Sequence, residues 1–417
     1  MRAFHMTWMT FFLCFFGWFG IAPLMPIVRQ DLGLTQAEIG NIIIASVAIT
    51  IFARLLIGWL CDRIGPRICY SLLLIIGSIP VITIGFSSSY ESFLLFRLAI
   101  GVIGASFVIT QYHTSVMFAP NVVGTANATV AGWGNMGGGA TLIVMPLIFA
   151  GFTAAGYTDA MAWRYSMVVP GIALFIMGFL YYRFTQDSPD GKFQSRRKND
   201  GMRNNGGSDF WSTCRDHRVW ILFLAYGACF GIEITIDNIA TLYFVDNFNL
   251  GLKEAGIIAG LFGMMNLFAR ALGGIFGDRA GKKFGVKGRI LILGMFLMME
   301  GIGIMIFSTM TSLPWAVATM LFFALFLKMA NGATYAVVPF INKKSMGMVA
   351  GIVGAGGNVG AVLAGFLFAS NDISYRESLF TIGIAVATVS VLSLLLAFIN
   401  SRAVIRETVP AQQLQTI

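Results

Sequence analysis

The chain has 417 residues, of which 57% are hydrophobic and 11% charged, whereas a soluble domain carries about 25% charged residues. This composition excludes a disordered chain, a disulfide-stabilised secreted scaffold and an ordinary soluble enzyme. The net charge of +9 does not indicate a nucleic-acid partner, because the basic residues follow the membrane topology described below.

Apolar stretches of about 20 residues recur along the whole chain, and each is long enough to cross a hydrocarbon core about 30 Å thick. They predict an all-α polytopic membrane protein with twelve transmembrane helices. In chain order, the predicted spans are 5–28, 39–61, 68–88, 92–117, 122–150, 165–185, 219–245, 254–277, 289–309, 313–340, 346–370 and 377–400.

The longest interruption is a polar, basic stretch rich in glycine and asparagine, which is typical of a flexible linker. It separates six predicted spans from six others. We therefore expect an N-terminal six-helix bundle at 1–185, a cytoplasmic linker at 186–217, a C-terminal six-helix bundle at 218–402 and a cytoplasmic tail at 403–417.

The distribution of lysine and arginine predicts the orientation. With both termini and the linker in the cytoplasm, 20 of the 28 basic residues lie inside, 4 lie outside and 4 lie within spans. This asymmetry predicts a multi-pass protein of the cytoplasmic membrane with both termini inside. It also accounts for most of the positive charge.

An internal repeat supports the division into two halves. Residues 52–65 align with residues 268–281 at an offset of 216, and 8 of the 14 positions are identical. A weaker match at an offset of 223 pairs Asn135 with Asn358. Parallel six-helix repeats around a central site are one known plan of secondary transporters.

The repeated segments resemble the short loop motif of the major facilitator superfamily. The motif residues are Gly58, Asp62, Arg63, Gly65 and Arg67 in the first copy, and Gly274, Asp278, Arg279, Gly281 and Lys283 in the second. The resemblance implies the major facilitator fold, in two six-helix bundles. It also implies that Asp62, Arg63, Asp278 and Arg279 form gating loops at cytoplasmic helix ends.

Two glycine-rich stretches, 131–139 and 351–360, resemble the nitrate signature of the nitrate/nitrite porter family within that superfamily. The resemblance covers essentially the whole chain. It implies that Arg54 and Arg270, on the second and eighth helices, grip the transported anion. The second stretch departs from the first in having Ala355 and no tryptophan. The seventh helix, from Tyr226, is more similar to the proton-coupled uptake branch than to the antiport branch.

The two arginines indicate a small anion without reference to any family. Arg54 lies eight residues before the helix end at Asp62, about 12 Å into the membrane, and the repeat places Arg270 at the same depth. Each costs about 2.5–3.5 kcal/mol at that depth. A guanidinium stays charged and fits a planar oxyanion bidentately. The alternative is that each arginine pairs with a carboxylate from another helix, for which the chain offers Glu233, Asp237 and Glu300.

Glycine in membrane helices permits close backbone approach, so packing is the simpler interpretation of the glycine-rich stretches. Asn135 and Asn358 recur at matched positions and could donate to an anion without adding charge, or could be packing residues. Among the aromatic residues near the motifs, Trp133 and Tyr226 are the candidates for the anion site.

Three residues are candidates for coupling transport to protons. Glu233 and Asp237 lie four residues apart on one face of the seventh helix, and intramembrane acids relay protons or pair with buried arginines. Arg97 begins a stretch that resembles a superfamily motif of the fourth helix linked to coupling. The spacing of the two acids would equally suit a static ion pair with an arginine. Glu300 and Lys328 have no assigned role, and His113 is interpreted as a packing residue.

The sequence thus predicts a secondary active transporter, and not an enzyme, that moves nitrate by alternating access with proton-coupled uptake, with nitrite as a second candidate substrate. The alternatives are a nitrate/nitrite exchanger, a carrier of another small anion such as an organic carboxylate, and a non-transporting nitrate sensor. We expect a monomer surrounded by lipid, with no cofactor, no metal site and no nucleic-acid partner.

Overall fold

A computed structural model describes residues 2–118, 123–189, 191, 214–341, 346–370 and 373–408. Most of the predicted linker 186–217 and of the predicted tail 403–417 lies outside these residues, and so does the side chain of Asp62.

The described chain is helical throughout. The helices before the linker, which we call the N half, are α1 (Arg2–Trp18), η1 (Ala22–Leu24), α2 (Met25–Leu32), α3 (Gln36–Ile64), α4 (Pro66–Thr83), η2 (Ile84–Phe86), α5 (Tyr90–Gly101), η3 (Val102–Ala105), α6 (Ser106–Met117), α7 (Val123–Ala154) and α8 (Asp159–Phe184). Those after the linker, the C half, are α10 (His217–Tyr226), η5 (Gly227–Gly231), α11 (Ile232–Phe248), α12 (Leu252–Met264), η6 (Met265–Leu267), α13 (Ala269–Thr309), α14 (Leu313–Val337), η7 (Val338–Phe340), α15 (Met346–Ala369) and α16 (Tyr375–Thr408).

Eleven helical segments among the described residues are long and apolar enough to span a membrane, and one of them, Leu252–Thr309, has 58 residues. Gly285 interrupts that segment with a φ of 62° and a ψ of −150°, a conformation that suits glycine because it has no Cβ. The segment therefore contains the eighth and ninth predicted spans, and twelve crossings result. The expected loop at 278–288 is instead mostly helical, because α13 continues to this break before it reverses.

Four spans change helix type partway across, and these interruptions position the candidate site. The first span contains Pro23 and Pro26, which begin η1 and α2. The fourth contains η3, the seventh contains the π-helical turn η5, and the eighth contains η6. Such turns often mark functional positions in helices. The last three lie next to Arg97, Glu233 and Arg270 respectively.

The glycine-rich stretches pack closely against the first and seventh spans in equivalent ways. A Cβ added at Gly137 on α7 would lie 2.2 Å from the carbonyl oxygen of Phe12 on α1. One added at Gly360 on α15 would lie 2.3 Å from the carbonyl oxygen of Gly227 in η5. These backbones cannot approach so closely with a larger residue present. The packing interpretation is confirmed at Gly137 and Gly360, whereas a Cβ at Gly351 would meet nothing within 4 Å.

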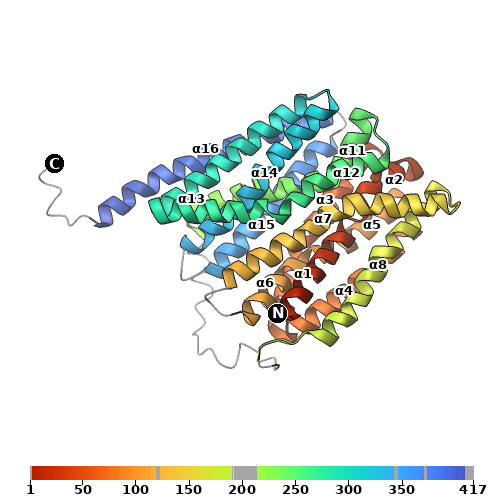
Figure 1. Cartoon of the computed structure of the whole chain (residues 1–417), viewed down its shortest axis with the longest axis horizontal. Coiled ribbons are helices and arrows are strands. Elements are labelled where there is room, and N and C mark those ends of the chain that lie inside the picture. The colour runs from red at the N-terminus through yellow and green to blue at the C-terminus, as the bar shows by residue number, and fades with distance from the viewer. Residues whose placement is uncertain are drawn as a thin grey trace, which may run out of the picture.

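The two halves meet along α7 against α12 and along α3 against α15. In Figure 1 the red-to-yellow helices of the N half lie below and to the right of the green-to-blue helices of the C half. At the end away from the linker, α2 and α11 lie side by side, and Arg29 forms a bidentate ion pair with Asp246 at 2.6 and 2.7 Å. At the same end Gln36 donates to the carbonyl of Ile373 at 3.3 Å. The halves are thus joined at the end opposite the linker.

Candidate functional site

The two predicted anion-binding arginines occupy matching places in the two halves. Arg54 on α3 is half-buried, and its Nη1 donates to the carbonyl oxygen of Gly354 on α15 at 3.2 Å. Its guanidinium carbon lies 5.6 Å from the ring centroid of Phe107. Arg270, near the start of α13, is 9% exposed and also lies 5.6 Å from a ring centroid, that of Phe230. Each guanidinium is therefore held beside an aromatic ring within the membrane region.

Two tyrosines connect the arginines. Tyr226 at the end of α10 and Tyr335 on α14 pack edge to face, with ring centroids 5.1 Å apart. Both phenols lie within electrostatic range of Arg54 and of Arg270. The structure therefore places Tyr226 near both arginines, and its role in anion binding stays a prediction. It adds Tyr335, which shares a helix face with Lys328 at a spacing of seven residues, a periodicity visible in the sequence.

The matched asparagines are buried without hydrogen bonds. Asn135 is 1% exposed and Asn358 is 0% exposed. Among the described residues, neither amide nitrogen nor amide oxygen of either side chain has a hydrogen-bond partner. Buried amides are costly unless they are paired, so these two groups fit the binding of a polar ligand between the helices.

Trp133, the other predicted aromatic residue, packs away from the arginines in the contacts that the structure gives. Its ring centroid lies 5.5 Å from that of Trp8 and 5.9 Å from that of Phe4, both on α1. These edge-to-face contacts secure α7 against the start of α1. A role for Trp133 in binding stays a prediction.

Glu233 on α11 is the centre of a buried charged cluster in the C half. Its Oε1 accepts from Asn266 at 2.8 Å and lies 2.7 Å from Nζ of Lys328. Its Oε2 accepts from Asn331 at 2.6 Å and lies 3.6 Å from Nη2 of Arg270. The alternative of pairing with a carboxylate is thus realised for Arg270. Within the described residues it is not realised for Arg54.

The other two coupling candidates lie where the halves meet. Arg97 on α5 donates to the carbonyl oxygen of Trp18 at 3.0 Å and to Oδ1 of Asn238 on α11 at 3.2 Å, which joins the N half to the C half. Asp237 faces the crossing of α7 and α12, because a Cβ at Gly138 would lie 3.3 Å from its Oδ2. Its Oδ1 has no hydrogen-bond partner among the described residues.

His113 is buried on α6 and bridges two groups of its own half. Its Nδ1 lies 2.5 Å from the hydroxyl of Tyr181, and its Nε2 lies 2.8 Å from the carbonyl oxygen of Gln186. The interpretation of His113 as a packing residue with satisfied hydrogen bonds is confirmed.

The predicted gating motifs lie at helix ends on the linker side. Asp278 pairs with Arg289, which lies across the Gly285 break and stacks 4.3 Å from the ring centroid of Phe340. Arg63 stacks on Trp59 at 4.1 Å, and Arg279 is exposed. Arg289 was not among the predicted gating residues, because its pairing depends on the reversal of the chain at Gly285. A gating role for these groups stays a prediction.

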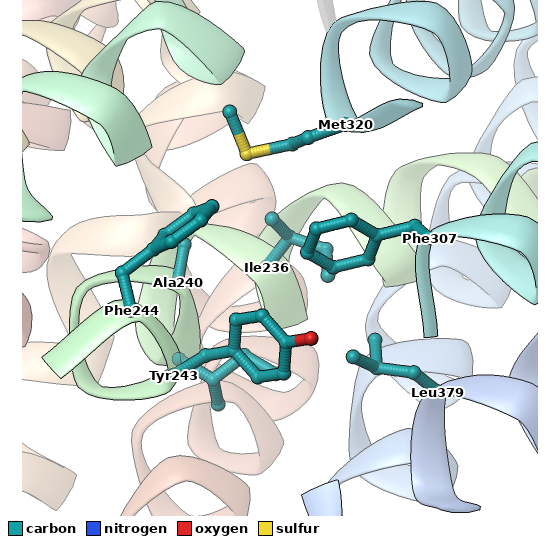
Figure 2. A pocket seen from close by; sticks show the side chains of 8 residues that line it. Ile236, Ala240, Tyr243, Phe244, Phe307, Met320 and Leu379 are labelled. Carbon is teal, nitrogen blue, oxygen red and sulfur yellow. The ribbon is translucent and has the colours of Figure 1, made fainter. Parts of the chain in front are cut away.

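A small cavity inside the C half does not suit an anion. Figure 2 shows its apolar walls, with the Tyr243 hydroxyl between Phe307 and Leu379. The lining residues are Ile236, Ile239, Ala240, Tyr243, Phe244, Phe307, Met320 and Leu379. No charged side chain is among them, so the arginine pair remains the candidate site.

Comparisons with known proteins identify the family of the chain. The family model of the Major Facilitator Superfamily matches residues 7–365. A relative described as high affinity nitrate transporter 2.5 of Arabidopsis thaliana is 42% identical over 381 residues, covering 91% of this chain and 76% of the relative. The nitrate/nitrite transporter NrtP of a Picosynechococcus strain is 30% identical over 450 residues, covering 87% and 83%.

Solved structures show the same fold at low sequence identity. A bacterial homologue of the human lysosomal transporter Spinster, in an inward-facing and occupied conformation, has a TM-score of 0.72 at 16% identity and covers 98% of each chain. The nucleoside transporter NupG has a TM-score of 0.65 at 15% identity, and the match covers 95% of this chain and 98% of the other.

Proposed function

This chain belongs to the major facilitator superfamily and, within it, to the nitrate transporter family, and from that premise we propose that it carries nitrate across the cytoplasmic membrane by alternating access, with nitrite as a second substrate. The observation that supports this most strongly is the matched arginine pair, Arg54 and Arg270, held in the membrane region beside aromatic rings. Two such cations favour a small anion over a cation or a neutral solute.

The proposed binding geometry uses donors from both halves. Nitrate is planar and singly charged, so a guanidinium can donate two parallel N–H groups to two of its oxygens. Asn135 and Asn358 would donate their unpartnered amide N–H groups to the same anion without adding charge. Tyr226 would bound the site between the arginines.

The contacts between the halves support a conformation that is closed at the end away from the linker. The Arg29–Asp246 ion pair and the Gln36 hydrogen bond close the opposite end. We infer from the excess of basic residues on the linker side that this side is cytoplasmic and that both termini lie there. In alternating access, the anion would reach the arginines from the cytoplasm when the linker side is open, and from outside once the closed end separates.

Uptake of an anion against an inside-negative potential needs an energy source, because each negative charge costs about 2.3 kcal/mol per 100 mV. Co-transport of two or more protons per nitrate would reverse the sign of the moved charge. We propose proton-coupled uptake, for which Asp237 and Glu233 are candidate acids, and Arg97 links the halves through Asn238. Glu233 already accepts hydrogen bonds from two asparagines and forms ion pairs with Lys328 and Arg270, which suits a fixed counter-ion.

Nitrate uptake into proteoliposomes tests the proposal, with and without an inward proton gradient and with and without internal nitrite. Accumulation driven by the gradient alone supports proton symport, whereas a requirement for internal nitrite would mean exchange. Arg54→Lys and Arg270→Lys should each lose uptake, because lysine lacks the planar fork. Arg183→Lys, an exposed site on α8, is the matched control and should transport normally. Normal uptake by both lysine variants of the pair would contradict the proposed site.

A further inference from the structure

Glu300 on α13 is a buried carboxyl group to which the binding site gives no role. The residue is 0% exposed, and neither carboxyl oxygen has a hydrogen-bond partner among the described residues. A carboxylate in such surroundings is far more costly than a neutral carboxylic acid. Glu300 therefore fits the protonated form in this conformation.

The surroundings of Glu300 contain few titratable groups. Lys328 on α14, Glu233 on α11 and the thiol of Cys229 in η5 lie within electrostatic range. On the side of α16, the neighbouring Gly301 packs against Gly383 and Ala387, which carry no charge. Lys328 is thus the cation that two carboxyl groups, Glu233 and Glu300, can share.

Lys328 is already committed to one of the two carboxyl groups. Its side chain is 0% exposed, and its Nζ lies 2.7 Å from Oε1 of Glu233 and 4.3 Å from the ring centroid of Phe262. Glu233 in turn lies 3.6 Å from Arg270, longer than its contact with Lys328. The stronger pairing with Lys328 leaves the Arg270 guanidinium more available to an anion.

Resting on the function proposed above, we propose that Glu300 is the carboxyl group that binds the transported proton. Lys328 pairs with Glu233 when Glu300 is protonated and with Glu300 when it is charged, so the protonation state of Glu300 determines whether Glu233 is free to pair with Arg270. With the proton on Glu300, Lys328 holds Glu233 and Arg270 receives nitrate. When the proton leaves to water, the Glu300 carboxylate attracts Lys328. Glu233 then pairs with Arg270 and displaces the anion.

This arrangement links the two ligands in the direction that symport requires. Proton binding to Glu300 favours nitrate binding to Arg270, and by reciprocity nitrate favours the protonated Glu300 by the same factor. Proton and nitrate are therefore taken up together and released together. Asp237 is the competing site, because it is also buried and one of its carboxyl oxygens has no hydrogen bond within the described part of the chain.

The first test measures nitrate binding to the purified full-length protein by titration calorimetry at several pH values, in buffers of different ionisation enthalpy. In the wild type, the nitrate Kd should rise by up to about tenfold per pH unit above the pH range in which Glu300 titrates, and nitrate binding should be accompanied by proton uptake. Glu300→Gln mimics the protonated form. Its Kd should be independent of pH, close to the wild-type acidic value, with no proton uptake.

The second test measures transport by the same variants in proteoliposomes. Glu300→Gln should retain nitrate counterflow at equal pH on both sides and lose accumulation driven by a proton gradient. Glu91→Gln, an exposed acid at the start of α5, is the matched control and should behave as the wild type. Asp237→Asn should keep the pH dependence of nitrate binding.

A third test uses the wild type alone, so it holds even if Glu300→Gln fails to fold. Dicyclohexylcarbodiimide reacts with protonated carboxyl groups in apolar surroundings, and the acid adds with its proton across one C=N bond. Peptide mapping should find the adduct on Glu300, and nitrate should increase its yield at alkaline pH.

The assignment would be overturned if the nitrate Kd of Glu300→Gln kept the wild-type pH dependence. It would also be overturned if Asp237→Asn lost that dependence while Glu300→Gln kept it, or if the carbodiimide adduct were absent from Glu300. Failure of the proposed function looks different, because the wild type would then show neither nitrate binding nor nitrate counterflow at any pH.

Discussion

The two halves place equivalent arginines in different electrostatic surroundings. Arg54 in the N half has a carbonyl oxygen and an aromatic ring as its described neighbours, whereas Arg270 in the C half belongs to a network with Glu233, Lys328 and two asparagines. The two halves thus carry equivalent arginines, but within the described residues only Arg270 forms an ion pair and adjoins a further buried cation, Lys328. In the proposed mechanism, the N half contributes Arg54 to anion binding, while the C half contributes both an arginine and the proton-binding carboxyl group.

The largest expected effect concerns stability, and it should differ between a substitution in the C half and one in the N half. Glu233→Gln would leave the buried Arg270 without its counter-ion and Lys328 without the carboxylate 2.7 Å away, which should lower the free energy of unfolding by about 3–5 kcal/mol. Arg54→Gln removes a cation without an ion pair among the described residues, so it should leave stability unchanged or raise it. Reversible unfolding in mixed detergent micelles measures both. Equal destabilisation by the two variants would mean that the asymmetry has no energetic consequence.

The next effect concerns nitrate affinity. Arg54→Lys and Arg270→Lys should each weaken binding by about 10- to 100-fold, the loss expected for one hydrogen bond to a charged group. The pH dependence of the residual binding should survive in Arg54→Lys and flatten in Arg270→Lys, because the carboxyl cluster contacts only Arg270. Calorimetric titration across pH gives both quantities. Identical pH profiles in the two variants would show that proton sensing is shared between the halves.

The contact between the halves gives a smaller effect. A Cβ at Gly139 on α7 would lie 2.5 Å from the backbone carbonyl carbon of Gly263 on α12. Gly139→Ala should therefore destabilise the protein by about 1–3 kcal/mol. It should also slow nitrate counterflow, because this contact joins the two halves. Gly151→Ala on the same helix meets nothing within 4 Å and serves as the control. Thermal unfolding and counterflow rates measure the difference. An unchanged melting temperature for Gly139→Ala would mean that α7 and α12 can move apart at little cost in free energy.

The smallest expected effect lies at the closed end. The side chains of Arg29 and Asp246 are 29% and 23% exposed, and such ion pairs contribute about 0.2–1 kcal/mol. Asp246→Asn should therefore shift the population toward opening at this end by about 1.4- to 5-fold, which distance measurements between spin labels on α2 and α11 would detect. The charge exchange Arg29→Asp with Asp246→Arg should restore the original distances. A shift that persists in this double variant would exclude the ion pair as the cause.

Much of the fold follows from local properties that can be predicted from sequence. A run of about 20 apolar residues must cross the membrane as a helix, because its backbone polar groups have no other partners there. The repeat at 52–65 and 268–281 then fixes two similar halves. The break at Gly285 was not predicted at its position, because a polar stretch of that length can continue a helix beyond the membrane before it turns.

The candidate site likewise contains some features that could be predicted from the sequence and others that could not. Hydrophobic length, the repeat and the cost of a buried cation identified the arginine pair, the asparagines and the acids of the seventh span from the sequence alone, since each depends on residue type and depth. Only the tertiary structure decided that Glu233 pairs with Lys328 and Arg270, that Tyr335 packs against Tyr226, and that Glu300 is left without a hydrogen-bond partner among the described residues. Spacing along one helix tells which residues share a face, but the rotation and crossing of neighbouring helices determine what that face meets.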